Sequence, residues 1–482
     1  MYSINGSVKN RLRNEIKGEQ IMTTAYKGTN KLITGIVFGV LTFWLFAQAM
    51  VNVVPAVQKD LGVSSGTLNI AISLTALFSG IFIVAAGGLA DKIGRKKITN
   101  IGLLLSIIGS LCLVLANGAT LLIIGRIIQG LSAACIMPST IALVKEYFEG
   151  AERQRALSYW SIGSWGGSGV CSLLGGAIAT YMGWKWIFIF SIIFAILALW
   201  LIKDTPESKA KQTGDSKFDF GGLMIFIITM LALNIFITQG AGIGWTNWIT
   251  IVLLIVAVIG AIVFIKFENG KSNALIDFGL FKNAPYTGAT VSNFLLNAVA
   301  GTLVVANTYV QEGRGFTSFQ SGMLSIGYLI AVLAMIRVGE KILQKIGAKK
   351  PMLWGTILTL IGVGVMGLTF LPDVAYTVVV FIGFALFGLG LGIYATPSTD
   401  TAVSNAPNDK IGAASGIYKM ASSLGSAFGV AISATVYAMI ADKSGVDAAA
   451  TGGIIANVIF AVIALLSIIF MVPNNAGKSE VK

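Results

Sequence analysis

The chain has 482 residues, of which 55% are hydrophobic and only 11% are charged, and its mean hydropathy is +0.82. Soluble domains carry about 25% charged residues, so this composition excludes an ordinary soluble enzyme. The sequence has no histidine, which excludes imidazole catalysis and histidine-ligated metals, and we expect neither a metal nor a cofactor. The net charge is +13, and the basic residues alternate with apolar runs along the chain instead of clustering. We therefore expect no nucleic-acid partner.

Apolar runs long enough to cross a bilayer follow one another along the chain. Each transmembrane helix needs about 20 apolar residues, and the hydropathy pattern indicates fourteen such runs. We therefore predict an all-α polytopic protein of the cell membrane with 14 transmembrane helices. The predicted spans lie at 32–55, 67–88, 98–116, 119–143, 156–180, 184–202, 220–239, 247–266, 287–310, 319–339, 351–371, 376–398, 412–438 and 452–472.

The distribution of basic residues predicts the orientation. Loops on the cytoplasmic side carry the excess of Lys and Arg. With a cytoplasmic amino terminus, most of the 34 Lys and Arg fall in cytoplasmic segments; the exceptions are four outside the cell and three within spans (Lys59, Lys185, Arg314, Lys443; Arg126, Arg337, Lys419). Since the number of spans is even, we expect both termini in the cytoplasm.

Short motifs recur in the first and last sets of six spans. KIGRKK at 92–97 returns as KIGAKK at 345–350, and PST at 138–140 returns at 397–399. Internal repeats are typical of transporters. The predicted organisation is a cytoplasmic segment, a six-helix bundle, a linker carrying two additional helices, a second six-helix bundle and a tail, at 1–31, 32–203, 204–286, 287–472 and 473–482.

The first 21 residues raise the question of where translation starts. The stretch KGEQIM ends at Met22, and Lys-Gly-Glu can be encoded by a purine-rich ribosome-binding sequence. We hypothesise that translation starts at Met22 and that residues 1–21 are an over-extended reading frame.

A charged turn, GGLADKIGRKK at 87–97, joins the second and third spans. A tight turn needs a glycine such as Gly94. Each basic residue near an anionic inner leaflet contributes about 1 kcal/mol of membrane attraction. The carboxylate of Asp91 is free to accept hydrogen bonds from an arginine or from the positive end of a neighbouring helix.

Two further motifs lie within spans. LIIGRIIQGLSAA at 122–134 places Arg126 inside an apolar helix, at a cost of about 2.5–3.5 kcal/mol, so its side chain needs a partner, a water-filled cavity or a route to the surface. GSWGGSGVCSLLGG at 163–176 aligns small residues on one helix face, which allows close packing; these are Gly163, Gly167, Gly175 and Gly176.

Together these motifs resemble the major facilitator superfamily, and from about Asn30 to Pro473 the chain is similar to its fourteen-helix drug:proton antiporter branch. The likeness to quinolone-resistance efflux proteins is carried by FWLFAQAMVNVVP (43–55), ERQRALSYWSIGSWGGSGVCS (152–172) and LGLGIYATPSTDTA (389–402). The antiporter glycine pattern ends in Gly-Pro, where this chain has Cys171 and Ser172. The resemblance implies the major facilitator fold and proton-driven export of amphiphilic antimicrobials such as fluoroquinolones and cationic dyes.

The resemblance also implies a cytoplasmic latch in the charged turn, made of Gly87, Asp91, Gly94, Arg95 and Lys96. A pump for amphiphiles needs an apolar, aromatic cavity with a few polar groups. Trp44, Gln48 and Asn52 are four residues apart and would share one face of an α-helix. With them, the candidate substrate-binding residues are Gln129, Tyr159, Trp160, Asn293, Asn297 and Tyr328, while Asn307 is a further candidate; each asparagine could instead hold helices together.

Proton coupling has no obvious carrier, because none of the 21 Asp and Glu residues lies at the centre of a predicted span. The carboxylate that many relatives carry on the first helix is replaced by Phe46. Asp400 is the deepest remaining acid, and Lys419 is a basic residue within a span. We hypothesise that Asp400 and Lys419, paired or separate, couple transport to protons, with Arg126 as an electrostatic bias.

Other functions remain open at this point. A nutrient symporter, or a sensor of the same fold that does not transport, would share these features. A membrane-embedded enzyme is disfavoured by the lack of histidine and of clustered acids. The expected partners are small amphiphilic drugs, protons and the lipid bilayer, and we expect a monomer.

Overall fold

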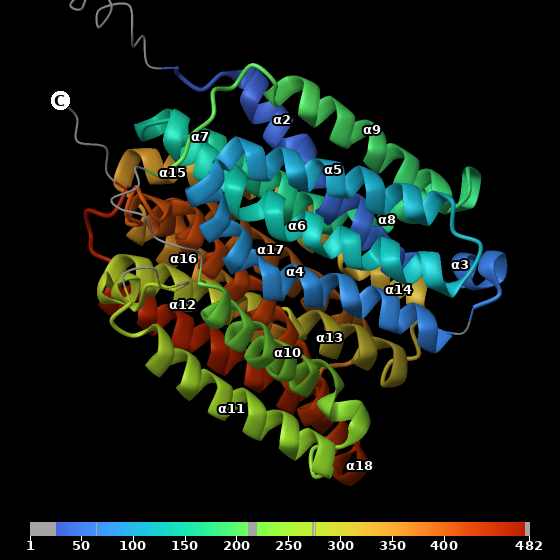
Figure 1. Ribbon diagram of the computed structural model, residues 1–482. Coiled ribbons are helices and arrows are strands. Elements are labelled where there is room, and N and C mark those ends of the chain that lie inside the picture. Colours follow the sequence, from blue (N-terminus) through green and yellow to red (C-terminus); the bar gives the residue numbers. More distant parts are fainter. Residues whose placement is uncertain (1–25, 64, 211–218, 272–273, 275, 478–482) are drawn as a thin grey trace, which may run out of the picture.

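The computed structural model describes residues 26–63, 65–210, 219–271, 274 and 276–477. In these residues the chain folds into long helices that run side by side (Figure 1). The hypothesis of a start at Met22 concerns residues outside the described ones. The described part is all-helical, which confirms the predicted fold class.

The N-terminal half opens with a broken helix and continues with six helices and one π-helical turn. The broken helix comprises α2 (Asn30–Leu41), η1 (Thr42–Ala47), η2 (Gln48–Asn52) and α3 (Val54–Leu61). The others are α4 (Ser65–Ile93), α5 (Arg95–Val114), α6 (Ala119–Tyr147), α7 (Gly150–Ser161), η3 (Ile162–Gly166), α8 (Gly167–Tyr181) and α9 (Lys185–Ile202).

Two additional helices and the C-terminal half follow. The additional helices are α10 (Phe220–Ile243) and α11 (Trp248–Glu268). The C-terminal half comprises η4 (Phe278–Lys282), α12 (Ala284–Ala298), α13 (Gly301–Glu312), α14 (Ser318–Leu324), α15 (Ile326–Ile346), α16 (Lys349–Met366), α17 (Asp373–Ser404) and α18 (Ile411–Met471). Within α18, Gly445 has φ 82°, which breaks the helix into two spans.

Twelve helices of the described chain are long and apolar enough to cross a membrane, and each overlaps one of the predicted spans. The two remaining predictions, 156–180 and 351–371, fall on the segments from α7 to α8 and on α16. The count of fourteen is consistent with these helices and stays a prediction.

The first predicted span, 32–55, is not one regular helix. A π-helical turn and a 3₁₀ segment interrupt it, and Pro55 stands in the first turn of the new helix α3, a position that needs no backbone N–H. Trp44 lies in the π-helical turn and Gln48 in the 3₁₀ segment, which has 3.0 residues per turn, so the predicted shared face of one regular α-helix is not formed by these two residues. The side chain of Asn52 is outside the described part.

Small residues let neighbouring helices approach closely, and they do so at equivalent places in the two halves. A Cβ on Gly125 of α6 would lie 2.9 Å from the carbonyl oxygen of Gly109 in α5. A Cβ on Gly383 of α17 would lie 2.8 Å from the carbonyl oxygen of Gly362 in α16. The sequence offset from Gly109 to Gly362 is the same as that between KIGRKK and KIGAKK, so this contact follows the internal repeat.

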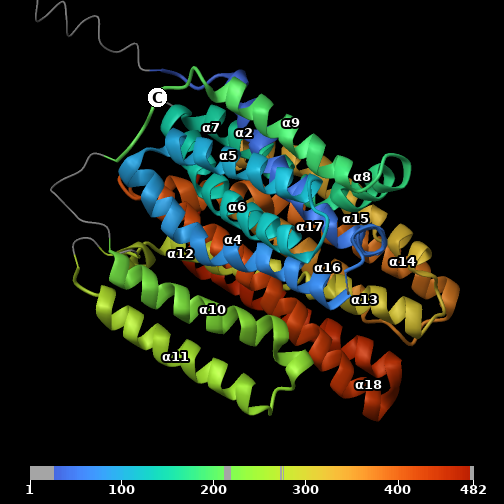
Figure 2. The ribbon, with the colours of Figure 1, turned by 45° about the vertical axis from the view of Figure 1, so that its right-hand side comes forward.

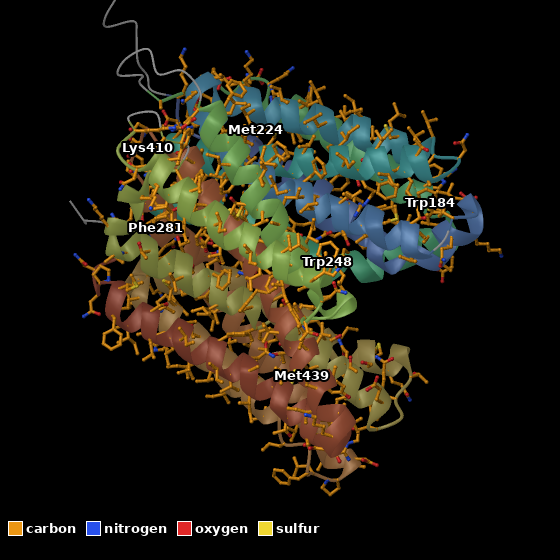
Figure 3. The ribbon with its side chains drawn as sticks, turned by 60° about the horizontal axis from the view of Figure 1, so that its bottom comes forward. Trp184, Met224, Trp248, Phe281, Lys410 and Met439 are labelled. Atoms are coloured by element: carbon orange, nitrogen blue, oxygen red, sulfur yellow. The ribbon has the colours of Figure 1, made fainter. Side chains whose placement is uncertain are left out.

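The additional helices α10 and α11 lie side by side along the outside of the bundle (Figures 1 and 2). Helix α10 packs against α18 and α4, one from each half. Their outer surfaces are apolar: Met224 and Trp248 are 55% and 71% exposed, and Figure 3 shows them on these helices. Such a surface suits a lipid environment.

Packing of α12 against α18 depends on a glycine, which gives the first prediction. A Cβ on Gly429 would lie 1.8 Å from the carbonyl oxygen of Ala298, whereas one on Gly364 of α16 would meet nothing within 4 Å. Overpacking of this kind costs about 1–3 kcal/mol. We expect Gly429→Ala to lower the thermal unfolding temperature of the purified chain in detergent, and Gly364→Ala to leave it unchanged or raise it. Equal unfolding temperatures for both variants would contradict this packing.

Candidate functional site

The charged turn after α4 joins the two halves at one end of the bundle. The side chain of Asp91 accepts hydrogen bonds from Arg95 Nη2 at 3.1 Å and from the backbone N–H of Ala413, in the first turn of α18, at 3.0 Å. Arg95 in turn donates to the carbonyl oxygen of Asn408 at 2.9 Å and to Glu146 at 2.5 Å. We call this end of the bundle, which carries residues 91–97 and 405–413, the latch end.

The carboxylate of Asp91 is placed where it is electrostatically favoured. The first N–H groups of a helix have no intrahelical acceptor and carry partial positive charge. Asp91 meets this charge at the start of α18, while Arg95 lies on its other side and is itself 1% exposed. One buried ion pair on the N-terminal half thus caps a helix of the C-terminal half.

Two glycines of the turn are required by close contacts. A Cβ on Gly87 would lie 2.2 Å from the carbonyl oxygen of Gly412, so the backbones of α4 and α18 touch there. Gly94 has φ 130°, a conformation that favours glycine, and a Cβ on it would meet the side chain of Glu207 at 2.5 Å. Either substitution would separate elements that form the latch end.

Glu207 is a part of this site that the sequence analysis missed. Its carboxylate oxygens accept from the backbone N–H groups of Lys96 and Lys97, each at 2.9 Å, at the start of α5. The same segment continues to Ala210, whose N–H donates to the carbonyl oxygen of Asp91 at 2.9 Å. The Nζ of Lys96 donates to the carbonyl oxygen of Lys203 at 2.6 Å. Glu207 is a single glutamate in a polar linker and belongs to no motif, so the sequence gives no means of predicting this role.

A second buried acid bridges the halves at the latch end. Asp400 of α17 is fully buried, and its carboxylate accepts from Arg153 Nε at 3.0 Å and from Gln154 Nε2 at 3.3 Å, both on α7. Gln154 also donates to the carbonyl oxygen of Gly477 at 3.0 Å. The structure therefore assigns Asp400 a partner other than Lys419, and the predicted pairing of those two residues is not found.

Further contacts close the same end. The Nζ of Lys145 in α6 donates to the carbonyl oxygen of Ala406, after α17. Gln344 Nε2 of α15 donates to the carbonyl oxygen of Ala151 at 3.3 Å. In this state the latch end is held shut by hydrogen bonds that four helices of the N-terminal half, α4, α5, α6 and α7, form with the C-terminal half.

The linker after α11 is tied to the start of α18 by an ion pair. Lys410 Nζ lies 2.6 Å from Asp277 Oδ2, and Figure 3 shows Lys410 at the opposite end of the molecule from Trp184. The hydrogen bond from Lys410 holds the pKa of the Asp277 carboxyl below its usual range. The pair therefore stabilises the folded chain at neutral pH, and this stabilisation is lost as the pH falls through the lowered pKa of Asp277.

Arg126 does not reach the surface. Its side chain is fully buried, and Nη1 donates to the carbonyl oxygen of Ala47 and to Gln129 Oε1, each at 2.8 Å. Its Nε and Nη2 atoms find no hydrogen-bond partner in the part of the chain that the structure describes. Gln129, a predicted substrate residue, also donates to Ser110 at 3.3 Å and so binds within the N-terminal half.

Aromatic residues of the N-terminal half surround Lys419. Its ammonium lies 4.7 Å from the ring centre of Trp160 and 6.0 Å from that of Trp44. The guanidinium of Arg337 lies over the ring of Tyr159 at 4.6 Å. The structure thus brings together Trp44, Trp160 and Lys419, which are separate in sequence. Gln48 is half-buried on the adjoining segment η2.

Among the predicted polar residues of the C-terminal half, Asn293, Asn307 and Tyr328 connect neighbouring helices, whereas Asn297 bonds within its own helix, α12. Asn293 Nδ2 donates to the carbonyl oxygen of Tyr418 at 2.9 Å and to Ser422 at 2.7 Å, and Asn297 donates to Asn293. Asn307 accepts from Ser321 at 2.9 Å, and Tyr328 stacks on Phe387 at 5.1 Å between ring centres. Their role in binding substrate stays a prediction.

Three of the four predicted packing glycines face the first, broken helix. A Cβ on Gly163 would lie 3.3 Å from Val40, and one on Gly167 would lie 3.1 Å from Leu41. A Cβ on Gly175 would lie 2.7 Å from Ala49. A Cβ on Gly176 would meet nothing within 4 Å, so Gly176 is not part of this contact. A larger residue is tolerated there on steric grounds.

No group of three or more Cys, Asp or Glu side chains that could hold a metal occurs among the described residues. The expectation that the protein works without metal or cofactor stays a prediction. All three cysteines, Cys112, Cys135 and Cys171, lie in the described part of the chain, and no disulfide joins any two of them.

Two related helical halves, apolar outer faces and buried polar contacts at the seam define a polytopic membrane transporter. Residues 36–430 match the model of the Major Facilitator Superfamily, and the chain belongs to this family. It is 57% identical to the "Quinolone resistance protein NorB" of Staphylococcus aureus (strain MRSA252) over 449 residues, which cover 93% of this chain and 97% of the relative.

Solved structures confirm the fold. The proton:xylose symporter XylE bound to 6-bromo-6-deoxy-D-glucose aligns with TM-score 0.64 at 17% identity, over 93% of this chain and 97% of the other. The human organic anion transporter MFSD10 (TETRAN) aligns with TM-score 0.62 at 13% identity, over 91% and 99%. At these identities the likeness concerns the fold alone.

The latch-end contacts predict the effect of neutralising Asp91. Removing its charge weakens the ion pair with Arg95 and the cap on α18, and hydrogen bonds to charged groups contribute about 1.5–3 kcal/mol. With spin labels on the exposed positions Lys97 of α5 and Lys350 of α16, we expect Asp91→Asn to add a longer-distance population that is absent from the unmutated chain.

The control for this measurement is Asp204→Asn, because Asp204 forms an exposed pair with Lys31 within the N-terminal half. This variant should leave the distance distribution unchanged. An unchanged distribution in Asp91→Asn as well would show that Asp91 does not hold this end shut.

Proposed function

We propose that this chain is a proton-driven multidrug efflux pump that works as a monomer and exports amphiphilic antimicrobials such as fluoroquinolones and cationic dyes. The observation that carries the proposal is its 57% identity, over nearly its whole length, to a quinolone resistance protein. A transporter of this size and fold needs no resident catalytic group, because the proton gradient supplies the free energy.

The latch end is proposed to face the cytoplasm, with both termini on the same side. Its turn carries Lys92, Arg95, Lys96 and Lys97, and such basic loops favour the cytoplasmic side. The structure then corresponds to the state closed toward the cytoplasm. In an export cycle this state follows loading of the drug and precedes its release outside.

The energetics allow such a cycle. Moving one charge down a potential of 100 mV releases about 2.3 kcal/mol. A tenfold concentration ratio corresponds to about 1.4 kcal/mol, so one proton would support a drug gradient of roughly fiftyfold.

We place proton coupling at Asp400. Charged Asp400 attracts Arg153 across the seam and favours the closed latch end. Protonation removes that attraction, so the halves separate more easily and the protonated carrier opens toward the cytoplasm, where the proton leaves. Arg126, with two guanidinium nitrogens that lack partners, would add positive potential within the N-terminal half. Lys419 is not paired with Asp400, and we assign it a different role below.

The alternatives are a nutrient symporter or a sensor that does not transport. The likeness to a xylose symporter concerns the fold alone. No described contact favours either alternative.

The test is accumulation of norfloxacin and ethidium in cells that express the chain, with and without a protonophore. We expect expression to lower the accumulation of both compounds and the protonophore to abolish the difference. Asp400→Asn, which cannot ionise, should reduce efflux at least tenfold and remove its dependence on external pH. The matched control is Asp204→Asn, at an exposed pair, which should behave like the unmutated chain.

Two results would count against this proposal. Equal accumulation in cells with and without the chain would contradict efflux. Full pH-dependent efflux by a well-expressed Asp400→Asn would leave efflux intact and contradict the assignment of proton coupling to Asp400.

A further inference from the structure

We propose that Lys419, Trp44 and Trp160 form a binding site for the carboxylate of an aromatic substrate, so that the pump recognises carboxylate-bearing drugs at this point. The inference rests on the proposed function and names the chemical class of one substrate group. It starts from a buried cation, Lys419, that pairs with no anion of the described chain.

Lys419 lies eight residues after the start of α18, about 12 Å along the helix axis, and its side chain is 5% exposed. Its ammonium takes part in none of the ion pairs and hydrogen bonds among the described residues. It instead forms cation–π contacts with the two indole rings. Cation–π contact offsets part of the cost of burying a charge, but an ammonium has three N–H donors. This site therefore has donors that no acceptor among the described residues uses.

A second donor beside Lys419 is also unused. Trp44 Nε1 is buried and has no hydrogen-bond partner among the described residues, whereas Trp160 Nε1 donates to Thr140 Oγ1 at 3.0 Å. The hydroxyl of Ser415, one turn before Lys419 on α18, is buried and unpartnered as well. Buried polar groups are normally satisfied, so these donors indicate a ligand that brings acceptors.

The buried acids of neighbouring helices are engaged elsewhere. Asp400 of α17 accepts from Arg153 and Gln154. Glu340 of α15 accepts from Arg337 and Gln344. A carboxylate on the substrate would supply the missing charge and acceptors, and charge-assisted bonds of this kind are the strong ones.

Trp44, which is half-buried, offers a surface for an aromatic body. Trp160 is 1% exposed and holds its orientation through the bond to Thr140. Trp44 and Trp160 belong to the N-terminal half and Lys419 to the C-terminal half. A ligand that binds all three bridges the halves, so its affinity changes when they move apart, as an alternating carrier requires. A substrate that is only cationic meets repulsion from Lys419 here.

The experiment measures binding to the purified full chain by isothermal titration calorimetry, with norfloxacin and its methyl ester as probes. The ester keeps the aromatic body and loses the anionic group. A lost bond to a charged group corresponds to about a ten- to hundredfold change in affinity. We expect Lys419→Gln to weaken norfloxacin by that factor and to change the ester by less than about twofold.

Two further variants control this result. Lys443→Gln removes an exposed lysine from the same helix, α18, and should change neither affinity. Trp44→Phe keeps an aromatic ring and removes the N–H donor, so it should weaken norfloxacin severalfold and spare the ester. Retained binding of the ester shows that each variant is folded.

The proposal is overturned if Lys419→Gln weakens both probes equally, as a purely structural or proton-coupling lysine would, or if it weakens neither. Norfloxacin could bind in a Lys419-dependent way while the chain fails to lower drug accumulation in cells. That result would support this site and contradict the efflux proposal. If the chain exports drugs but binds norfloxacin and its methyl ester equally, the efflux proposal stands and the carboxylate site is contradicted.

Discussion

The structure depends on one contact between its halves: the backbones of α4 and α18 touch at Gly87 and Gly412. This approach brings Asp91 within hydrogen-bonding distance of the first turn of α18. Arg95 then connects Asp91 to the segment before α18. A larger residue at either glycine, or loss of the charge on Asp91, would separate the halves where they are closed.

Buried charges are expensive in a membrane, and their placement shows how the protein uses them. Asp91 and Asp400 lie at the latch end, and each is paired with an arginine of the N-terminal half. Asp400 thus forms an ion pair with Arg153 across the seam between the two halves. By contrast, within the described part of the chain Arg126 keeps unused donors and Lys419 has no anionic partner, and we propose that protons or ligands change the balance of charge at these two positions.

Much of this could be predicted from the sequence, because the signals are local. Apolar runs predict helices, and the charged turn singles out Gly87 and Asp91, which the structure places against α18. Long-range partners carry no such signal: Arg153 and Asp400 are far apart in the chain, as are Glu207 and the start of α5. The π-helical and 3₁₀ turns of the first span also escaped prediction, since periodicity assumes a regular α-helix, and amide side chains such as Asn293 look alike whether they bind ligands or helices.

The proposed transport cycle requires the latch end to open in each round. Ala151 of α7 and Gln344 of α15 are in contact there, so cysteines at these two positions, in a chain whose native cysteines are replaced by alanine, can be cross-linked reversibly. Drug transport into inverted membrane vesicles is the readout. The account predicts that the cross-link stops transport and that dithiothreitol restores it; transport at the full rate with the cross-link in place would contradict it.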